Sequence, residues 1–453
     1  MGTKRTADYV VTGGGAMGMA FTDTLINESD ASVIIVDKHH RPGGHWNDAY
    51  PFVRLHQPSA FYGVNSKKMG NDAIDQVGWN AGLFELASGA EVCAYFDQVM
   101  QRQFLPSGRV EYFPMCESLG EGKVRSLVSG EEFEVEAKRA TVDATYMNVT
   151  VPSVRPPAYE VATGVKIAPL NELPKLARPS TGYVIVGAGK TGIDACLWLL
   201  ANRVNPDAIT WIMPRDSWLL DRAKIQPGRD ANDAGLSGQF DAIARSETIR
   251  EAFEMLDAEG ELLRLSKDVW PTMYRCATVT KPELEQLQRI KNIVRMGRVQ
   301  RIEPSRVILD QGTLELDAER QYIDCSADGL ERRASLPVFD GNQITLQTVR
   351  PCQQVFSAAF IAHVEASDRD ESAKNALCAV APHPNTDLDF LRATNAMAMS
   401  QVVWMQDPEI TKWLTNARLN IAAGSRPDQM SSNVDSLLLA VQKLQQYVAE
   451  LDA

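Results

Sequence analysis

The chain has 453 residues, of which 44% are hydrophobic and 23% are charged, and its formal net charge is −12. This length exceeds what one hydrophobic core usually supports, so we expect at least two domains of an ordinary soluble protein. The negative charge argues against a nucleic-acid partner, because phosphate binding requires clustered lysines and arginines. The chain contains no run of about 18 apolar residues, so we expect no membrane-spanning segment. We expect a cytoplasmic protein.

The N-terminal part predicts a strand, a glycine-rich turn, an amphipathic helix and a second strand, in the run YVVTGGGAMGMAFTDTLI and then ASVIIVD. Gly13, Gly15 and Gly18 match the G-x-G-x-x-G pattern. They permit a tight turn, a close approach to a pyrophosphate and close helix–strand packing. Asp37 ends the second strand, where a carboxylate can accept hydrogen bonds from the ribose of an adenosine, and Lys38 follows it. The pattern therefore predicts a dinucleotide site.

A second unit of the same kind begins near residue 182 with YVIVGAGKTGIDACLWLL, followed by AITWIMPR. Its glycine loop and helix start supply the next candidate contacts: Gly187, Gly189, Lys190, Thr191 and Gly192. Arg215 stands where an NAD-binding unit carries an acid. Arg215, with Lys190, can pair with a 2′-phosphate, which favours NADPH over NADH. The alternative is a surface arginine at the end of a strand.

Helical patterns dominate two later regions, residues 238–293 and the tail from about residue 387. Between the two glycine units, a proline-rich stretch near residues 151–164 is a plausible domain crossing. The seven cysteines are widely spaced without a Cys-x-x-Cys pair. This spacing predicts reduced thiols rather than a disulfide framework and argues against a dithiol reductase. The histidines lack matching carboxylate or cysteine spacing, so no metal site is expected.

The stretch after the first unit reads RPGGHWNDAYPFVRLHQPSAFYGVNS, from Arg41 to Ser66. It contains, in order, Gly43-Gly44-His45-Trp46, Tyr50-Pro51, Arg54-Leu55-His56, Ser59 and Tyr62. With the two glycine units, this run resembles the two-dinucleotide flavoprotein monooxygenases, which include flavin-containing, Baeyer–Villiger and N-hydroxylating enzymes. The resemblance implies FAD on the first unit and NADPH on the second. It also implies FAD contacts from Gly44, His45, Trp46, Arg54, His56 and Gln57.

The resemblance implies an α/β fold with two Rossmann-like dinucleotide-binding domains. We expect an FAD domain over residues 1–155 and 331–453, and an NADPH domain over 156–330 inserted into it. The NADPH domain would carry a helical insertion at about 238–293, and the chain would end in a helical C-terminal segment. By position in the family, Gln353, Gln354 and Ser357 would return to the flavin. The alternative is a core helix with two capping amides.

The candidate catalytic residues are His56, Arg54 and Gln57. A histidine near the flavin can act as acid, base or hydrogen-bond donor, because its pKa lies near working pH. Equally, His56 can simply hold the cofactor loop by hydrogen bonding. His56 stands where Baeyer–Villiger enzymes carry an aspartate. In addition, the family's F-x-G-x-x-x-H fingerprint is replaced here by AYEVATGVKIAPLNELPKL, which has no histidine.

The resemblance implies that NADPH reduces FAD and that the reduced flavin forms a C4a-(hydro)peroxyflavin with O2. That species would oxygenate a small organic substrate by N-, S- or Baeyer–Villiger-type chemistry. A first alternative, favoured by the missing histidine, is an NADPH-dependent flavoprotein reductase or oxidase without oxygen transfer. A second is a non-catalytic FAD-binding redox sensor. The expected partners are a small-molecule substrate and O2, with a possible homodimer.

Overall fold

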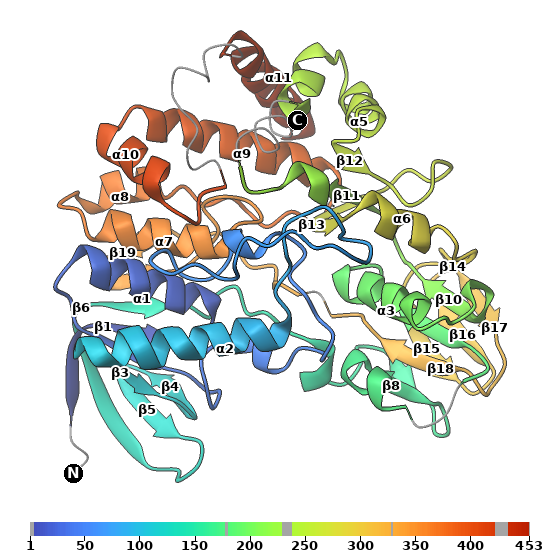
Figure 1. Ribbon diagram of the computed structural model, residues 1–453, viewed down its shortest axis with the longest axis horizontal. Helices are drawn as coiled ribbons and strands as arrows, with labels where there is room; N and C mark the ends of the chain where they lie inside the picture. The colour runs from blue at the N-terminus through green and yellow to red at the C-terminus, as the bar shows by residue number, and fades with distance from the viewer. Residues whose placement is uncertain (1–3, 177–179, 229–237, 328, 422–433, 453) are drawn as a thin grey trace.

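The computed structural model describes residues 4–176, 180–228, 238–327, 329–421 and 434–452. It is a mixed α/β structure with two separate sheets, a mostly parallel one at the lower left and a wholly parallel one at the right of Figure 1. Helices cover the sheets and extend above them. The α/β fold class predicted from the two glycine units is confirmed.

The first sheet joins strands from two distant parts of the chain, in the order β19-β20-β6-β1-β2-β3. All neighbours pair in parallel except β19 and β20, and the hairpin of β4 and β5 pairs with β6. Strand β2 is buried along its whole length, as expected for a parallel strand covered on both faces. The strands are β1 (Arg5–Thr12), β2 (Val33–Val36), β3 (Val110–Phe113), β4 (Cys116–Gly120), β5 (Lys123–Ser126), β6 (Glu132–Asp143), β19 (Phe339–Asp340) and β20 (Gln343–Thr345).

Three helices bury one face of this sheet. They are α1 (Ala16–Glu28), α2 (Gly89–Val99) and α7 (Gln354–Glu365), and α1 packs directly on α7. The first core contains Phe21 of α1, Phe96 of α2 and Phe356 of α7, each of them fully buried. Burial of such aromatic side chains provides much of the stabilisation of a core. Residues more than 250 positions apart in the chain thus form one structural unit.

The second sheet is entirely parallel, in the order β14-β10-β9-β18-β8. Its strands are β8 (Ile167–Pro169), β9 (Tyr183–Val186), β10 (Ile209–Ile212), β14 (Asn292–Val294) and β18 (Gln321–Asp324). Helix α3 (Lys190–Ala201) packs on α6 (Lys281–Leu287) beside it. A further sheet consists of β7 (Glu160–Val161), β15 (Val299–Glu303), β16 (Arg306–Leu309) and β17 (Gly312–Glu315). In sequence, the second sheet lies between the two parts of the first. The exact domain limits remain a prediction.

The region expected to be helical, residues 238–293, is only partly so. Residues 238–245, α5 (Ile249–Ala258) and α6 are helical, but β12 (Leu262–Leu263) and β13 (Met273–Val279) pair with β11 (Ser217–Asp221). The helical pattern predicted through residue 293 stops at Leu287, because Asn292–Val294 form the edge strand β14, which pairs with β10. Pairing with an existing sheet therefore outweighs local helix propensity here.

The C-terminal segment is helical, as predicted. It comprises α8 (Glu371–Leu377), α9 (Leu388–Met405), α10 (Pro408–Asn416) and α11 (Val434–Asp452). Helices α9 and α11 pack together near α5 at the top of Figure 1. A third core there includes Phe253, Phe390 and Leu444. Among the helices described, none is long and apolar enough to cross a membrane.

The prediction that all cysteines are reduced is wrong for two of them. Cys276 in β13 and Cys352 before α7 form a disulfide, with their Cα atoms 5.9 Å apart and their positions 76 apart in sequence. Spacing along the chain could not reveal this pair, because β13 and the start of α7 meet only in the folded protein. The other five cysteines are free and buried.

Candidate functional site

The first glycine loop joins the end of β1 to the start of α1. Gly13 has a φ of +104°, a left-handed conformation that favours glycine. A Cβ on Gly18 would overlap the carbonyl oxygen of Gly13, so only glycine lets α1 approach this closely. No side chain caps α1 at Gly15, and Gly15, Ala16 and Met17 all line a cavity. The free N–H groups of this helix start form a site for an anion.

Asp37 follows β2 and is bound to this loop. It is buried, and its Oδ2 accepts a hydrogen bond from the backbone N–H of Gly14. Its Oδ1 accepts from the backbone N–H of His39 at 2.6 Å. The His39 ring lies between two carboxylates, 3.0 Å from Asp37 and 2.9 Å from Asp48. The hydrogen bonds to Asp37 and then Asp48 raise the pKa of His39, although burial opposes this shift.

The segment after Asp37 closes over the first glycine loop. The backbone N–H of Gly43 donates to Gly14, and a Cβ on Gly44 would lie 3.0 Å from the Cα of Gly15. Trp46 donates from Nε1 to the Tyr62 hydroxyl at 2.7 Å, and the His45 ring lies 5.3 Å from the Trp46 ring. Burial lowers the pKa of His45 to about 4, so this ring is neutral at working pH.

The second glycine loop joins β9 to α3 with the same geometry. Gly187 has a φ of +127°, and a Cβ on Gly192 would overlap the carbonyl oxygen of Gly187. In contrast, a Cβ on Gly189 would meet no atom within 4 Å. No side chain caps α3 at Gly189. The loop therefore presents free helix N–H groups beside open space that a phosphate can occupy.

Lys190 is held by residues of both units. Its ammonium pairs with Asp194 one turn later on α3, and the Tyr50 hydroxyl donates to the same carboxylate oxygen at 2.5 Å. Tyr50 belongs to the segment that closes the first loop, yet its side chain lies in the core of the second sheet. Burial, with Asp194 beside it, raises the pKa of the Tyr50 phenol well above its usual value. The phenol is therefore a stable hydrogen-bond donor.

Both loops open on one cavity of about 760 Å³. This volume lies within the range of ligand-binding sites in proteins. The predicted residues that line it are Gly13, Gly15, Asp37, Lys38, Gly44, His45, Trp46, Arg54, His56, Gln57, Gly189, Lys190 and Thr191. The predicted residues outside the lining are Gly18, Gly187, Gly192 and Arg215. The glycines among these act on backbone packing instead. Within the described residues, no group of three His, Cys, Asp or Glu side chains suits a metal ion.

The three candidate catalytic residues lie together in this cavity. His56 accepts at Nδ1 from the backbone N–H of Thr278 at 3.3 Å. Burial, together with the nearby cations Lys190 and Arg222, lowers the pKa of His56 to about 3. The ring is therefore neutral, and with Nδ1 accepting, the proton is assigned to Nε2. This geometry favours a hydrogen-bond donor over a general base.

The neighbours of His56 are oriented by contacts of their own. The side-chain oxygen of Gln57 accepts from the Gln353 amide at 2.9 Å. Arg54 donates to the carbonyl oxygen of Leu86 at 3.2 Å, while its side chain remains exposed at the cavity. Gln57 thus holds the wall of the cavity, and Arg54 supplies a positive charge at its rim.

The chain is 55% identical over 427 residues to "Uncharacterized protein Rv2000" of Mycobacterium tuberculosis (strain ATCC 25618 / H37Rv). It has the same identity to "Uncharacterized protein Mb2023" of Mycobacterium bovis. Each match covers 93% of this chain and 78% of the relative. The chain belongs to their family. No protein-family model matches it.

Several solved structures resemble this family member at low sequence identity. An oxidised steroid monooxygenase bound to NADP has a TM-score of 0.48 and 16% identity, covering 80% of this chain and 85% of that one. A flavin-containing monooxygenase from Stenotrophomonas maltophilia has a TM-score of 0.44 and 18% identity, covering 83% and 100%. Cyclohexanone monooxygenase bound to ε-caprolactone has a TM-score of 0.48 and 14% identity, covering 83% and 92%. Residue roles in this chain rest on its own geometry.

The sequence prediction missed Arg275, which lies on β13 and lines the large cavity. Its Nε and Nη2 donate to Oδ1 of Asn385 at 3.0 and 2.6 Å, and Arg215 donates to the same oxygen at 3.1 Å. The residue was hidden because its region was predicted to be helical. The run MYRCATV, which contains the strand-favouring residues Tyr274, Thr278 and Val279, was the available signal.

The start of α7 also contributes to the cavity. Gln353 and Gln354 line it, and their contact with a flavin stays a prediction. Ser357 lies outside the lining, and its hydroxyl accepts from the backbone N–H groups of Val349 and Arg350 at 3.1 and 3.2 Å. Ser357 therefore fixes the turn that presents the two glutamines.

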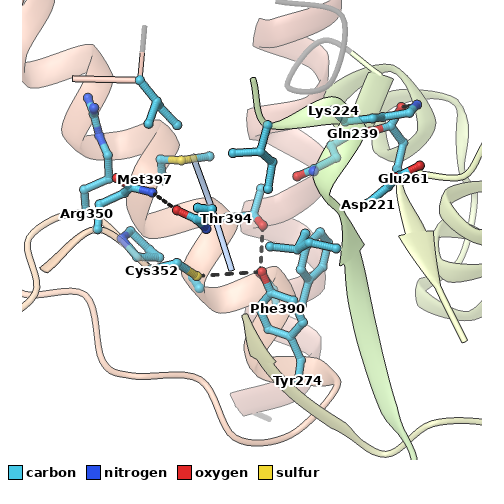
Figure 2. A pocket seen from close by; sticks show the side chains of 17 residues that line it. Asp221, Lys224, Gln239, Glu261, Tyr274, Arg350, Cys352, Phe390, Thr394 and Met397 are labelled. Atoms are coloured by element: carbon cyan, nitrogen blue, oxygen red, sulfur yellow. Dashed lines mark hydrogen bonds and ion pairs between the residues drawn. The ribbon is translucent and has the colours of Figure 1, made fainter. Parts of the chain in front are cut away.

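A second cavity of about 90 Å³ adjoins the large one and is shown in Figure 2. The two cavities share three lining residues, Gln57, Cys352 and Gln353. Tyr274, Phe390, Thr394 and Met397 line one part of the smaller cavity, while Asp221, Lys224 and Glu261 form a charged group at its other side. The Gln57–Gln353 hydrogen bond thus lies in the wall that separates the large cavity from the small one.

Proposed function

We propose that this protein is an FAD-dependent oxidoreductase that draws electrons from NADPH, and that it is a monooxygenase for a small organic substrate. The observation that carries the proposal is the opening of both glycine loops on one cavity. Two nucleotide cofactors bound at these loops would meet inside it, which hydride transfer requires. A cytoplasmic location and a homodimer belong to the same proposal.

The first loop fits the FAD diphosphate and adenosine. The helix start at Gly15–Met17 offers N–H groups to the diphosphate, and the close contact of Gly15 with Gly44 leaves no room for side chains between loop and segment. Asp37 offers carboxylate oxygens for the ribose. Trp46 and Tyr62, joined by their hydrogen bond, form a rigid aromatic wall beside the ligand.

The second loop fits the NADPH diphosphate. The open space at Gly189 and the free N–H groups of α3 lie where a diphosphate would approach. Arg275 provides a cation on the same cavity, suited to a 2′-phosphate. Lys190 is engaged with Asp194, so its main role in the proposal is to fix the helix start.

When bound, the flavin supplies hydride acceptance and reaction with oxygen. By resemblance, the oxygenating species would be a C4a-(hydro)peroxyflavin. Neutral His56 would donate a hydrogen bond from Nε2 into the cavity, and Gln57 with Gln353 would position its wall. Water exclusion by these side chains protects a reactive oxygen adduct. Together these residues would orient the bound cofactor and shield it from water, while the cofactor would provide the redox chemistry.

Two measurements test this proposal in sequence. Protein loaded with FAD should bleach under anaerobic NADPH, and then consume oxygen to give a substrate product labelled from ¹⁸O2. If the flavin never bleaches, the oxidoreductase assignment is wrong.

The second candidate is an NADPH-dependent reductase or oxidase without oxygen transfer. The observation that favours it is the absence of a histidine from the stretch AYEVATGVKIAPLNELPKL before the second loop. Hydrogen peroxide equal to the NADPH oxidised, with every substrate tried, would establish this candidate in place of the monooxygenase.

A further inference from the structure

The Cys276–Cys352 disulfide lies in the wall of the large cavity. Cys276 is part of β13, whose residues Met273, Arg275 and Ala277 line that cavity. Cys352 lines both the large and the small cavity and is only partly buried. A reductant bound in the large cavity therefore has direct access to one sulfur of the bond.

The backbone at both cysteines is unusual. Cys276 has a φ of +58° and Cys352 a φ of +63°, and both values lie in the left-handed region that non-glycine residues rarely occupy. The register of β13 against β11 also shifts between Tyr274 and Thr278, which places Cys276 in a bulge. Strained backbone and bulges concentrate at functional sites, where they aim a side chain. Here they bring the two sulfurs together at the cavity wall.

Two neighbouring groups favour the reduced form of Cys352. The Tyr274 hydroxyl donates to the Cys352 sulfur at 3.9 Å, as Figure 2 shows. Cys352 also lies one residue before Gln353, the uncapped N-terminus of the twelve-residue helix α7. A hydrogen-bond donor and a helix N-terminus both stabilise a thiolate, which makes it a better leaving group.

The remaining five cysteines differ from this pair. They are Cys93, Cys116, Cys196, Cys325 and Cys378, and all are buried and unpaired. Burial raises the pKa of each of these thiols, so they are poor nucleophiles. Reactive sulfur chemistry is therefore confined to the disulfide.

We propose that Cys276 and Cys352 form a redox-active couple that accepts two electrons and two protons from a reductant in the large cavity. The S–S bond breaks, each sulfur gains one electron and one proton, and the reductant is oxidised by two electrons. The donor is either a dissolved dithiol, which becomes a cyclic disulfide, or a reduced flavin, which becomes oxidised FAD. With a dithiol, attack at Cys352 releases Cys276 as a thiolate, and the second thiol of the donor then releases Cys352.

The first arm of the test uses dithiothreitol and does not depend on the proposed function. The folded protein is equilibrated in equal concentrations of reduced and oxidised dithiothreitol, and its thiols are then alkylated and mapped by mass spectrometry. Most molecules should carry alkyl groups on both Cys276 and Cys352, while circular dichroism stays unchanged. If the disulfide stays intact in the folded protein both with dithiothreitol and with FAD plus NADPH, and is reduced only after denaturation, it is purely structural and the proposal is overturned. Free thiols at both positions in air-oxidised protein overturn it as well.

The second arm identifies the donor. Protein loaded with FAD is incubated anaerobically with NADPH and alkylated in the same way. Thiols at Cys276 and Cys352 in this arm assign the electrons to the flavin, while thiols with dithiothreitol alone assign them to a dissolved dithiol. A protein whose flavin does not bleach fails the proposed function, yet the first arm still decides the disulfide.

Variants separate the two sulfurs. In Cys276→Ser, the partly exposed Cys352 should react with 5,5′-dithiobis(2-nitrobenzoic acid) within minutes. In Cys352→Ser, the buried Cys276 should react at least several-fold more slowly. Cys378→Ala, in the first core, is the control. In this variant the Cys276–Cys352 disulfide should still form, and dithiothreitol should reduce it as in the wild type. Equal, slow reaction of Cys276 and Cys352 would contradict attack at Cys352.

Discussion

Arg215 and Arg275 share one hydrogen-bond acceptor, the side-chain oxygen of Asn385. The two guanidinium groups come from the loop between β10 and β11 and from β13, and Asn385 comes from the loop before α9. Only Arg275 lines the large cavity. A single amide thus holds two cations together, and the two differ in their access to a ligand in the large cavity.

This difference predicts unequal effects on nucleotide choice. Arg275→Ala should weaken NADPH binding roughly 10- to 100-fold, because a charge-assisted hydrogen bond to phosphate is worth about 1.5–3 kcal/mol. NADH binding should change little. Arg215→Ala, the matched control, should have a smaller effect on NADPH, since Arg215 does not line the large cavity. Isothermal titration with both nucleotides measures this, and equal losses for NADPH and NADH would exclude a 2′-phosphate role.

Asp37 should be required for FAD more than Asp48 is. Asp37→Asn places an amide where Oδ2 accepts from Gly14 and where a ribose would bind, so FAD affinity should fall roughly 10-fold or more. Asp48→Asn removes only the second carboxylate of the His39 pair. Fluorescence titration of apoprotein with FAD compares the two. Similar affinities for the two variants would refute the ribose assignment.

The two glycines that flank the start of α3 should respond differently to alanine. Gly189 has a φ of −79° and open space at its Cβ, so Gly189→Ala should keep the melting temperature while it weakens NADPH binding. Gly192→Ala forces a methyl group onto the carbonyl oxygen of Gly187. Overpacking of this kind costs about 1–3 kcal/mol and should lower the melting temperature by several degrees. Thermal unfolding and nucleotide titration together check the pair, and unchanged binding in Gly189→Ala would argue against a phosphate there.

His39 should make stability depend on pH. Its pKa in the folded protein lies above the usual 6.5, so the protonated ring stabilises the fold. That contribution is complete below the unfolded pKa and disappears as the pH rises through the raised folded pKa. The melting-temperature difference between the wild type and His39→Gln should therefore be largest at low pH and shrink above about 6.5. His40→Gln, at an exposed neighbour, is the control, and a difference that grows with pH would reverse the assigned sign.

Sequence reasoning succeeded where backbone geometry restricts residue choice. The glycines at positions 13, 18, 187 and 192 are required by left-handed turns or by close helix contacts, so their spacing identified both loops. It failed where distant segments meet. Arg275 and Cys276 lie on β13, a strand whose pairing with β11 is set by tertiary contacts and which local pattern assigned to a helical region, and Cys352 reaches Cys276 only in the folded protein.

The positions of Tyr50 and Phe52 constrain where the chain can be cut if the second glycine unit, from about residue 156, is moved into another protein. Tyr50 is buried in the core of the second sheet, and Phe52 stacks on Trp198 of α3 with ring centres 5.1 Å apart. A fragment cut at residue 156 would leave both behind and expose the apolar surface they cover, which promotes aggregation. A chimera that transplants the second unit must therefore bring residues 50–53 with it or retain a recipient segment of matching shape. The second sheet and residues 50–53 therefore have to be exchanged together, although those residues lie in the part of the chain that forms the first sheet.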